Sequence, residues 1–336
     1  MNILGIETSC DETAAAVVRD GRDVRSNVVL TQIAQHRPFG GVVPEIACRA
    51  HLEALPGVID AALEEANTTW SEIDAIAVTR GPGLASSLLI GVSAAKGLAR
   101  ALNKPLLPVN HLEGHVFSVF LGNEVAIADA CPLLLLLVTG GHTCLILMDA
   151  VGEYRLLAST CDDAAGEALD KGAKLMGLGY PGGPEVEKAA LDGNPKAISF
   201  PIGFKRHEKE TLGFSFSGLK TSLRYHLENH PDQLRDGGLA DVAASYQEAV
   251  MDALVMQLER AMKQVEVRAF ACVGGVAKNQ YLRQRLDDLS TKTGLPLMLT
   301  PMQYCTDNAA MIAAIAGARP HDPADMALDV KPTWPL

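Results

Sequence analysis

The sequence predicts an α/β protein built from two similar halves. A three-strand meander with a polar turn after its first strand occurs twice along the 336 residues, and a unit of strand, glycine turn and helix also occurs twice. The content of apolar residues (48%) and charged residues (21%) is that of an ordinary globular enzyme, and the chain is long enough to form two lobes with sizeable cores.

The two meanders show the same alternation of apolar runs and turns. In the first copy, strands are expected at residues 2–6, 13–19 and 23–30, with a small polar turn at 7–12 and a hairpin turn at Asp20-Gly21. In the second copy, strands are expected at residues 133–138, 143–148 and 154–158, with a turn at Thr139-Gly140-Gly141. The shared order of strands and turns indicates an internal duplication.

The strand, turn and helix units follow each meander. The first is expected as a strand at residues 75–79, a Gly-Pro-Gly turn and a helix at 84–102; the second as a strand at 269–273, a Gly-Gly turn and a helix at 279–289. Such turns bring backbone close to a ligand, and helix N-termini favour anions. This is the plan of a two-lobed actin/hexokinase/Hsp70-like (ASKHA) fold, in which a nucleotide lies in a cleft between the lobes.

The expected domain boundaries follow from this duplication. We expect a first lobe at residues 1–122, a join at 122–130, a second lobe at 130–317, and a proline-rich tail at 318–336 that packs on the lobes.

Composition excludes several classes of protein. The most apolar run, residues 133–138, has strand length rather than transmembrane length, and the N-terminus lacks the regions of a signal peptide. The seven cysteines are odd in number and include no C-x-x-C pair, which favours reduced thiols in a cytoplasmic protein. The chain contains no P-loop motif.

The net charge of −11 argues against broad nonspecific binding of nucleic acid, but it leaves room for a local basic groove. Two short basic stretches are candidates, "FKRHEK" at residues 204–209 and "LRQRL" at residues 282–286. Each could equally be solvated surface charge.

The stretch "VNHLEGHVF" at residues 109–117 places His111 and His115 four residues apart. On a helix these two rings share one face and can hold one metal ion. Glu113 would point roughly 200° from His111 and about 160° from His115, away from such an ion. The pattern therefore lacks the base of an H-E-x-x-H protease. Two unrelated polar histidines remain the alternative.

Ten short motifs then resemble one family. They are, in order, "GIETSCDET" (5–13), "GGVVPE" (40–45), "GPGL" (81–84), "HLEGH" (111–115), "GGHT" (140–143), "DDAAGEALDK" (162–171), "YPGGP" (180–184), "FSFSGLK" (214–220), "GGVAKN" (274–279) and "CTDNAAM" (305–311). Together they resemble the universal tRNA threonylcarbamoyladenosine transferase family, formerly called O-sialoglycoprotein endopeptidases, over nearly the whole chain. "ETSCDE" is similar to the bacterial and organellar branch.

The resemblance implies a reaction and a third metal ligand. Threonylcarbamoyl would pass from threonylcarbamoyl-AMP to the exocyclic amine of the adenosine 3′ of the anticodon, in tRNAs that read codons beginning with A. Asp307 of "CTDNAAM" would join His111 and His115 around one divalent ion, Fe(II) or Zn(II), since imidazole and carboxylate suit both. Implied partners are a shorter inactive paralogue of the first lobe, a P-loop ATPase subunit and a separate synthase that makes the adenylate.

The resemblance also implies substrate-binding residues. The turn that would wrap the adenylate comprises Leu137, Val138, Thr139, Gly140 and Gly141. The residues expected at the ribose are Asp170, Gly183 and Glu187, and Asn279 is expected to face the adenine. "GGVAKN" departs from the family's commoner "GGVSANR" beside that asparagine, and Thr139 replaces the usual serine. No role is assigned to "FSFSGLK".

Three acids of the first polar turn, Glu7, Asp11 and Glu12, are candidates for catalysis, because they could orient the metal or the donor; they could equally be acidic residues at a strand end. Three other classes remain open. A small-molecule kinase of the same fold would use Mg(II) and would not need two imidazoles. A metalloprotease lacks its base. A nucleotide-gated binding module without catalysis would not need the three metal ligands.

Overall fold

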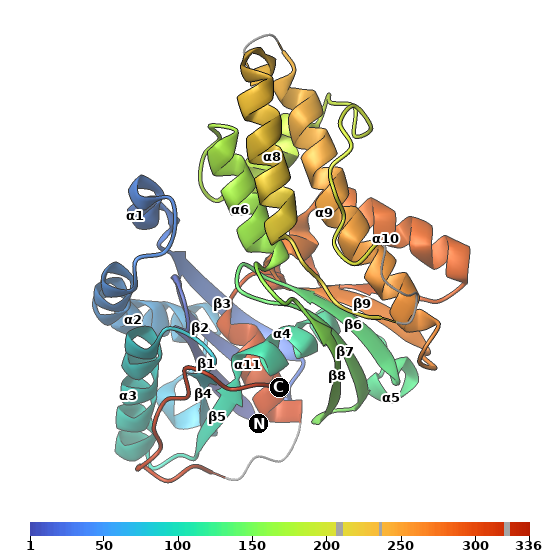
Figure 1. Ribbon diagram of the computed structural model, residues 1–336. Helices are drawn as coiled ribbons and strands as arrows, with labels where there is room; N and C mark the ends of the chain where they lie inside the picture. Colours follow the sequence, from blue (N-terminus) through green and yellow to red (C-terminus); the bar gives the residue numbers. More distant parts are fainter. Residues whose placement is uncertain (206–210, 235–236, 319–322) are drawn as a thin grey trace. The chain divides into compact units, whose positions relative to one another are not determined.

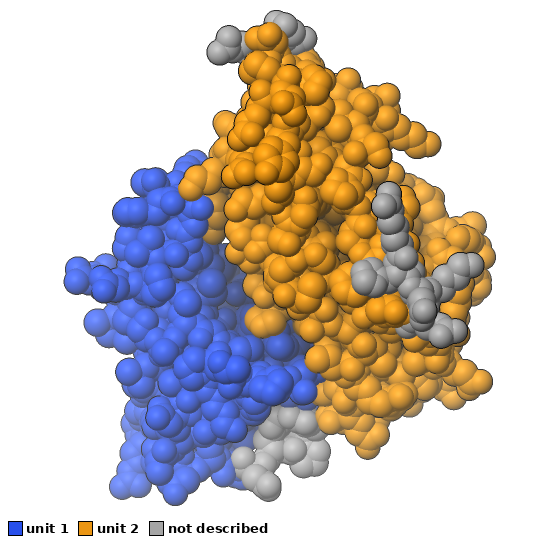
Figure 2. Space-filling model, viewed as in Figure 1, with its two compact units in different colours: residues 1–125, 300–336 blue, residues 126–299 orange. Residues whose placement is uncertain are grey.

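A computed structural model describes residues 1–205, 211–234, 237–318 and 323–336. The chain forms two compact units, which Figure 2 colours separately: unit 1 is Met1–Val125 with Thr300–Leu336, and unit 2 is Ala126–Leu299. Most of the basic stretch "FKRHEK" lies outside the described residues. Along the part of the chain described, no helix combines the length and apolarity needed to cross a membrane.

Unit 1 is built on a five-stranded mixed sheet with the order β3-β2-β1-β4-β5. Its strands are β1 (Asn2–Glu7), β2 (Glu12–Arg19), β3 (Asp23–Thr31), β4 (Ala75–Gly81) and β5 (Leu106–Asn110). β1 to β3 form the expected antiparallel meander, and β1, β4 and β5 run parallel.

Unit 2 repeats this topology with the order β10-β9-β6-β7-β8. Its strands are β6 (Leu133–Val138), β7 (Thr143–Ala150), β8 (Glu153–Ser159), β9 (Ala269–Val273) and β10 (Leu297–Leu299). β6 to β8 form the second antiparallel meander, and β6, β9 and β10 run parallel. The matching strand orders confirm the predicted fold class of two duplicated α/β units.

Helices cover both faces of the unit 1 sheet (Figure 1). The helices of this unit are α1 (Ile33–His36), α2 (Pro44–Glu65), α3 (Ala85–Leu102), α4 (His111–Phe117) and α11 (Ala309–Ala318), with 3₁₀ turns at Arg37–Phe39, Trp70–Glu72, Ser118–Phe120 and Met302–Tyr304. Leu4 and Ile6 belong to the core formed with α2 and α3. A Cβ on Gly5, between them, would meet the Ala309 carbonyl oxygen at 2.5 Å, so α11 packs on the opposite face.

The position of α11 differs from the expected domain boundary. Residues 300–317 are expected in the second lobe, but they belong to unit 1. The reason is the small-residue surface of α11, which fits closely against the glycine of β1. This return of the chain brings residues near 307 into the unit that carries α4.

The C-terminal residues 323–336 pack on unit 1. The Ala324 amide donates to the Leu106 carbonyl at 2.9 Å, and the Lys331 amide donates to the Arg80 carbonyl at 2.8 Å. The Asn110 side chain donates to the Trp334 carbonyl at 3.1 Å. The tail therefore lies along the ends of β4 and β5.

The helices of unit 2 gather at the carboxyl end of β6 and β9 and beside the sheet. They are α5 (Ile127–Ala130), α6 (Ala165–Leu175), α7 (Gly182–Ala190), α8 (Ser217–Asn229), α9 (Leu239–Met262) and α10 (Gln280–Thr293), with 3₁₀ turns at Pro231–Leu234 and Gly275–Lys278. Buried Tyr246 of α9 donates its hydroxyl to the Ala168 carbonyl of α6 at 2.8 Å. This contact fixes α6, whose N-terminus faces the β6–β7 turn.

Candidate functional site

Helix α4 begins where β5 ends, at Asn110. The Asn110 side-chain oxygen accepts hydrogen bonds from the backbone N–H groups of Leu112 (2.9 Å) and Glu113 (3.4 Å) and thereby caps the helix. The predicted helical spacing of the two histidines is therefore correct, and the rings of His111 and His115 lie 4.7 Å apart.

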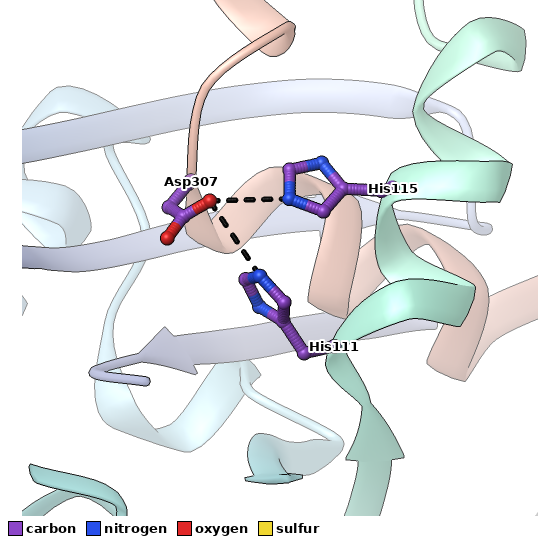
Figure 3. A group of neighbouring side chains, drawn as sticks. All are labelled: His111, His115 and Asp307. Atoms are coloured by element: carbon purple, nitrogen blue, oxygen red, sulfur yellow. Dashed lines mark hydrogen bonds and ion pairs between the residues drawn. The ribbon is translucent and has the colours of Figure 1, made fainter. Parts of the chain in front are cut away.

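Asp307 lies against both histidines (Figure 3). Its Oδ1 is 3.5 Å from Nε2 of His111 and 3.1 Å from Nε2 of His115. The two rings come from α4, and the carboxylate comes from the segment just before α11. One ligand atom from each of the three residues lies within 4.8 Å of the other two.

This set fits a divalent metal. Ligand atoms placed about 2.1 Å from one ion stand about 3.0–3.4 Å apart, which is close to the two measured nitrogen–oxygen separations. Two imidazoles and one carboxylate suit zinc or iron and leave coordination positions open. Both histidines are buried, and Asp307 is partly buried.

Glu7, at the end of β1, orients His111. Its Oε2 lies 3.1 Å from His111 Nδ1 and accepts a hydrogen bond from the Thr79 hydroxyl, while its Oε1 accepts the Ser9 N–H at 2.6 Å. Burial lowers the pKa of His111, but the charges of Glu7 and Asp307 raise it by more, to about 9. Burial raises the pKa of Glu7, but the charge of His111 and its hydrogen bond outweigh this and lower it. Glu7 therefore holds Nδ1 and leaves Nε2 directed at Asp307.

His115 has a different environment from His111. Burial lowers its pKa, and its hydrogen bond with Asp307 only partly offsets this effect. Among the described residues, no hydrogen-bond partner contacts its buried Nδ1. A neutral imidazole is the form that binds a metal, so the environment of His115 already favours a ligand.

The other two candidate acids, Asp11 and Glu12, follow Glu7 on the same turn. Burial and the negative charges of Asp307 and Asp11 raise the pKa of Glu12 well above its usual range. The negative charge of Asp307 therefore acts on Glu12. Glu113 is buried on α4 but is not a member of the cluster found among the described residues, as its helical angle predicts.

In unit 2 the β6–β7 turn has an open glycine backbone. The Thr139 hydroxyl accepts hydrogen bonds from the N–H groups of Gly141 (3.3 Å) and His142 (3.0 Å). Neither Gly140 nor Gly141 has a positive φ, and a Cβ added to either would meet nothing within 4 Å. Neither backbone conformation nor internal packing requires glycine there, whereas the close approach of a ligand would.

The N-terminus of α6 lies directly against this turn. A Cβ on Gly166 would meet the Thr139 carbonyl oxygen at 2.6 Å, and the Ala165 N–H donates to the Thr143 hydroxyl at 2.9 Å. The glycine turn and the first turn of α6 therefore lie together. Such an arrangement favours a phosphate.

The predicted ribose and adenine residues lie on three neighbouring helices. The Asp170 carboxylate accepts the Gly182 N–H at 2.6 Å, beside Gly183, and the Glu187 carboxylate accepts the Gln280 N–H at 2.6 Å. Gln280 follows Asn279 directly in the sequence. The structure thus joins α6 to the start of α7, and α7 to the start of α10.

Asn279 also has a structural role, in addition to the one expected at the adenine. Its side-chain oxygen accepts the Leu282 N–H at 2.8 Å and caps α10, and its amide nitrogen donates to Gln247 at 2.9 Å. The side chain is buried. An N-cap asparagine before a helix is a recognisable sequence signal.

Two further motifs have structural partners. Asp162 accepts hydrogen bonds from the hydroxyls of Ser215 (2.5 Å) and Ser217 (2.7 Å), which are the serines of "FSFSGLK". Arg285 of "LRQRL" pairs with Glu248 at 2.8 Å and Asp252 at 2.5 Å, so this arginine serves the packing of α10 on α9 rather than a free basic groove.

Comparison with known proteins identifies the family. The family model described as TsaD, tRNA N6-adenosine threonylcarbamoyltransferase, matches residues 23–314. The chain belongs to this family. It is 51% identical to the tRNA N6-adenosine threonylcarbamoyltransferase of Syntrophobacter fumaroxidans over 94% of this chain and 93% of that one. It is 49% identical to that of Trichlorobacter lovleyi over 100% of this chain and 97% of that one.

Solved structures support the same fold for this tRNA N6-adenosine threonylcarbamoyltransferase family member. Full-length HypF in its phosphate- and nucleotide-bound form is 12% identical with a TM-score of 0.60, covering 94% of this chain and 46% of that one. Component A of (R)-2-hydroxyglutaryl-CoA dehydratase from Acidaminococcus fermentans is 13% identical with a TM-score of 0.54, covering 94% and 98%. These likenesses confirm the ASKHA-like fold class. The chain is a transferase of a tRNA-modifying family.

Proposed function

We propose that the chain transfers threonylcarbamoyl from threonylcarbamoyl-AMP to the exocyclic amine of the adenosine 3′ of the anticodon, in tRNAs that read codons beginning with A. The observation that carries the proposal is the His111, His115 and Asp307 cluster within a chain of this tRNA-modifying family. A protease or a kinase of the same fold explains that combination less well.

The chemistry accounts for the need of an activated donor. The exocyclic amine of adenine is a weak nucleophile, because its lone pair is delocalised into the ring. An acyl-adenylate supplies a good leaving group, so the protein needs donors for the phosphate and for the charge that develops on the carbonyl oxygen. In unit 2 the open backbone of the turn at Gly140 and the N-terminus of α6 beside it would offer such donors.

The residues of unit 1 would bind the metal ion and orient the donor. His111, His115 and Asp307 would hold one Fe(II) or Zn(II) ion, which when bound would act as a Lewis acid on the donor. Glu7 fixes the orientation of His111, and the turn with Asp11 and Glu12 would orient the donor next to it. The partners of the proposal are tRNA, the adenylate, a shorter inactive paralogue of the first lobe and a P-loop ATPase subunit.

In unit 2 we assign the adenylate to the turn from Leu137 to Gly141, the ribose to Asp170, Gly183 and Glu187, and the adenine to the neighbourhood of Asn279. The support is the convergence of these residues at the carboxyl ends of β6 and β9, where open α/β sheets bind ligands.

Gly140→Ala is expected to weaken AMP binding about tenfold, because a methyl group would block one N–H contact with the phosphate. The melting temperature should not change, since the added Cβ meets no atom within 4 Å. Calorimetric titration with AMP measures the affinity. Gly57→Ala, which also adds a Cβ in free space but in unit 1, is the control. Equal affinity in all three proteins would contradict the assignment.

Metal binding is expected to release at least one proton per ion near pH 7. In the metal-free protein the pKa of His111 is raised to about 9, so His111 carries a proton at neutral pH that an ion must displace. The apparent affinity should therefore rise with pH and flatten above about 9. Titration in buffers of different ionisation enthalpy counts the protons. Release of none between pH 6 and 8 would contradict binding of the ion by a His111 that is protonated in the metal-free protein.

The experiment that tests the proposed reaction uses purified threonylcarbamoyl-AMP, the metal-loaded protein with its companion proteins, and two matched tRNAs. One tRNA carries adenosine 3′ of the anticodon, and the other carries guanosine at that position. We expect the modified nucleoside only in the first tRNA. Equal labelling of both, or of neither, would contradict the assignment of the acceptor.

A further inference from the structure

The turn that follows β1 has three consecutive carbonyl groups, each held by a different segment. The Ser9 carbonyl accepts the Leu84 N–H at 2.8 Å, and the Asp11 carbonyl accepts the Gln32 N–H at 3.0 Å. The Cys10 carbonyl lies 3.0 Å from Nε2 of His51. Two of these donors are backbone groups, so His51 is the only side chain among the three.

The hydrogen bonds determine the tautomer of His51. A carbonyl oxygen can only accept, so Nε2 must carry the proton that it donates to Cys10. His51 is fully buried, and burial lowers its pKa, so the ring is neutral and Nδ1 is an acceptor. The Thr13 hydroxyl at 2.8 Å and the Gln32 amide at 3.2 Å are its donors.

These bonds continue in one direction away from the turn. Because the Gln32 amide nitrogen donates to His51, its oxygen accepts from Nε2 of His36 at 3.2 Å. Nδ1 of His36 then accepts the Val43 N–H at 3.3 Å. Each group in the chain from Val43 to Cys10 has a role that fits a neutral histidine. The network thus connects the "GGVVPE" stretch to the polar turn.

The held turn lies beside the candidate metal ligands. The Ser9 hydroxyl is 3.1 Å from Nδ1 of His111, and the charge of Asp307 acts on both Cys10 and Glu12. If the Cys10 peptide rotated, the side chains on either side of it would move relative to His111 and Asp307.

We propose that His51 is a positioning residue for the transfer reaction: by donating Nε2–H to the Cys10 carbonyl, it holds the Ser9–Cys10–Asp11–Glu12 turn against the metal ligands. This inference rests on the proposed function for its effect on catalysis. His51 is not one of the three candidate ligands; its hydrogen bonds go to Thr13, Gln32 and the Cys10 carbonyl, and it acts through the backbone of the turn.

Two substitutions separate this role from general packing. In His51→Gln the amide nitrogen lies as many bonds from Cβ as Nε2 does and can still donate to Cys10. In His51→Asn the amide reaches only the place of Nδ1, so the contacts with Thr13 and Gln32 can remain while the Cys10 contact is lost. His51→Gln therefore keeps the hydrogen bond to Cys10, and His51→Asn keeps those with Thr13 and Gln32.

The measurements are kcat at saturating adenylate and tRNA, the Zn(II) dissociation constant of the metal-free protein, and the melting temperature. We expect His51→Asn to lose about 10- to 100-fold in kcat and in metal affinity, as loss of a group that orients metal ligands does. His51→Gln should stay within a few-fold of the wild type in both. Equal losses in the two variants, or a ranking that follows only the melting temperature, would overturn the proposal.

A measurement on the wild-type protein tests the proposal even if a variant fails to fold. Nitrogen NMR shifts of the His51 ring should show a protonated Nε2 and an unprotonated Nδ1. The opposite tautomer would overturn the proposal, because it cannot donate to Cys10. If the wild type made no modified nucleoside, the proposed function would fail, while the Zn(II) affinities and the tautomer would still test the role of His51.

Discussion

Replacing His115 with alanine is expected to abolish nucleoside modification, whereas Glu113→Gln should retain most of it. His115 is a member of the three-residue cluster, and its loss leaves two candidate ligands for the ion. Glu113 lies on the same helix but outside the cluster. An acyl-adenylate needs no base to activate water, so the carboxylate of Glu113 has no step to perform.

The measurement is modified adenosine per tRNA after nuclease digestion, with the melting temperature of each variant as control. Glu113 is buried, and its replacement by the isosteric amide keeps the volume of the side chain. Loss of activity in Glu113→Gln at an unchanged melting temperature, with activity retained in His115→Ala, would contradict the assignment.

Replacing His111 and His115 together with alanine is expected to reduce the metal content from about one ion per chain to none, because a single carboxylate is a weak site for Fe(II) or Zn(II). Elemental analysis of the purified proteins measures this directly. Glu113→Gln serves as the matched control on the same helix and should keep its ion. Equal metal content in the wild type and the double variant would show that these two histidines do not hold the ion.

The sequence predicts the two sheets well because each meander and each strand–turn–helix unit is encoded locally. Periodic apolar runs and glycine turns fix where β1 to β3 and β6 to β8 begin and end within one or two residues. The short parallel strands β5 and β10 are not predicted, because a three- to five-residue apolar run carries no period of its own.

The set of candidate metal ligands could be predicted only in part from local sequence patterns. The helical spacing of His111 and His115 follows from the sequence, but Asp307 is 192 residues from His115 and is identified only through the family resemblance. The same long-range return explains the error in the domain boundary, since α11 packs on β1 rather than beside the strands that precede it in the chain.

The roles of Glu7 and His51 could not be predicted from local sequence patterns either. Glu7 is expected only as one of three acids at a strand end, and the structure places its carboxylate 3.1 Å from His111 Nδ1. His51 has a detectable signal: it interrupts the buried face of α2 between Ala47 and Leu55 at helical spacing. A histidine in such a stripe predicts a buried hydrogen-bond partner, but the sequence does not say that the partner is the Cys10 carbonyl.

The most direct test of the central claim supplies the metal-loaded protein and its companion proteins with threonine, bicarbonate, ATP and tRNA, and with casein in a parallel reaction. We expect threonylcarbamoyl-modified adenosine in the tRNA, dependent on His115, and no cleavage of casein. Peptide cleavage that depends on the metal and on Glu113, with no modified nucleoside, would contradict it.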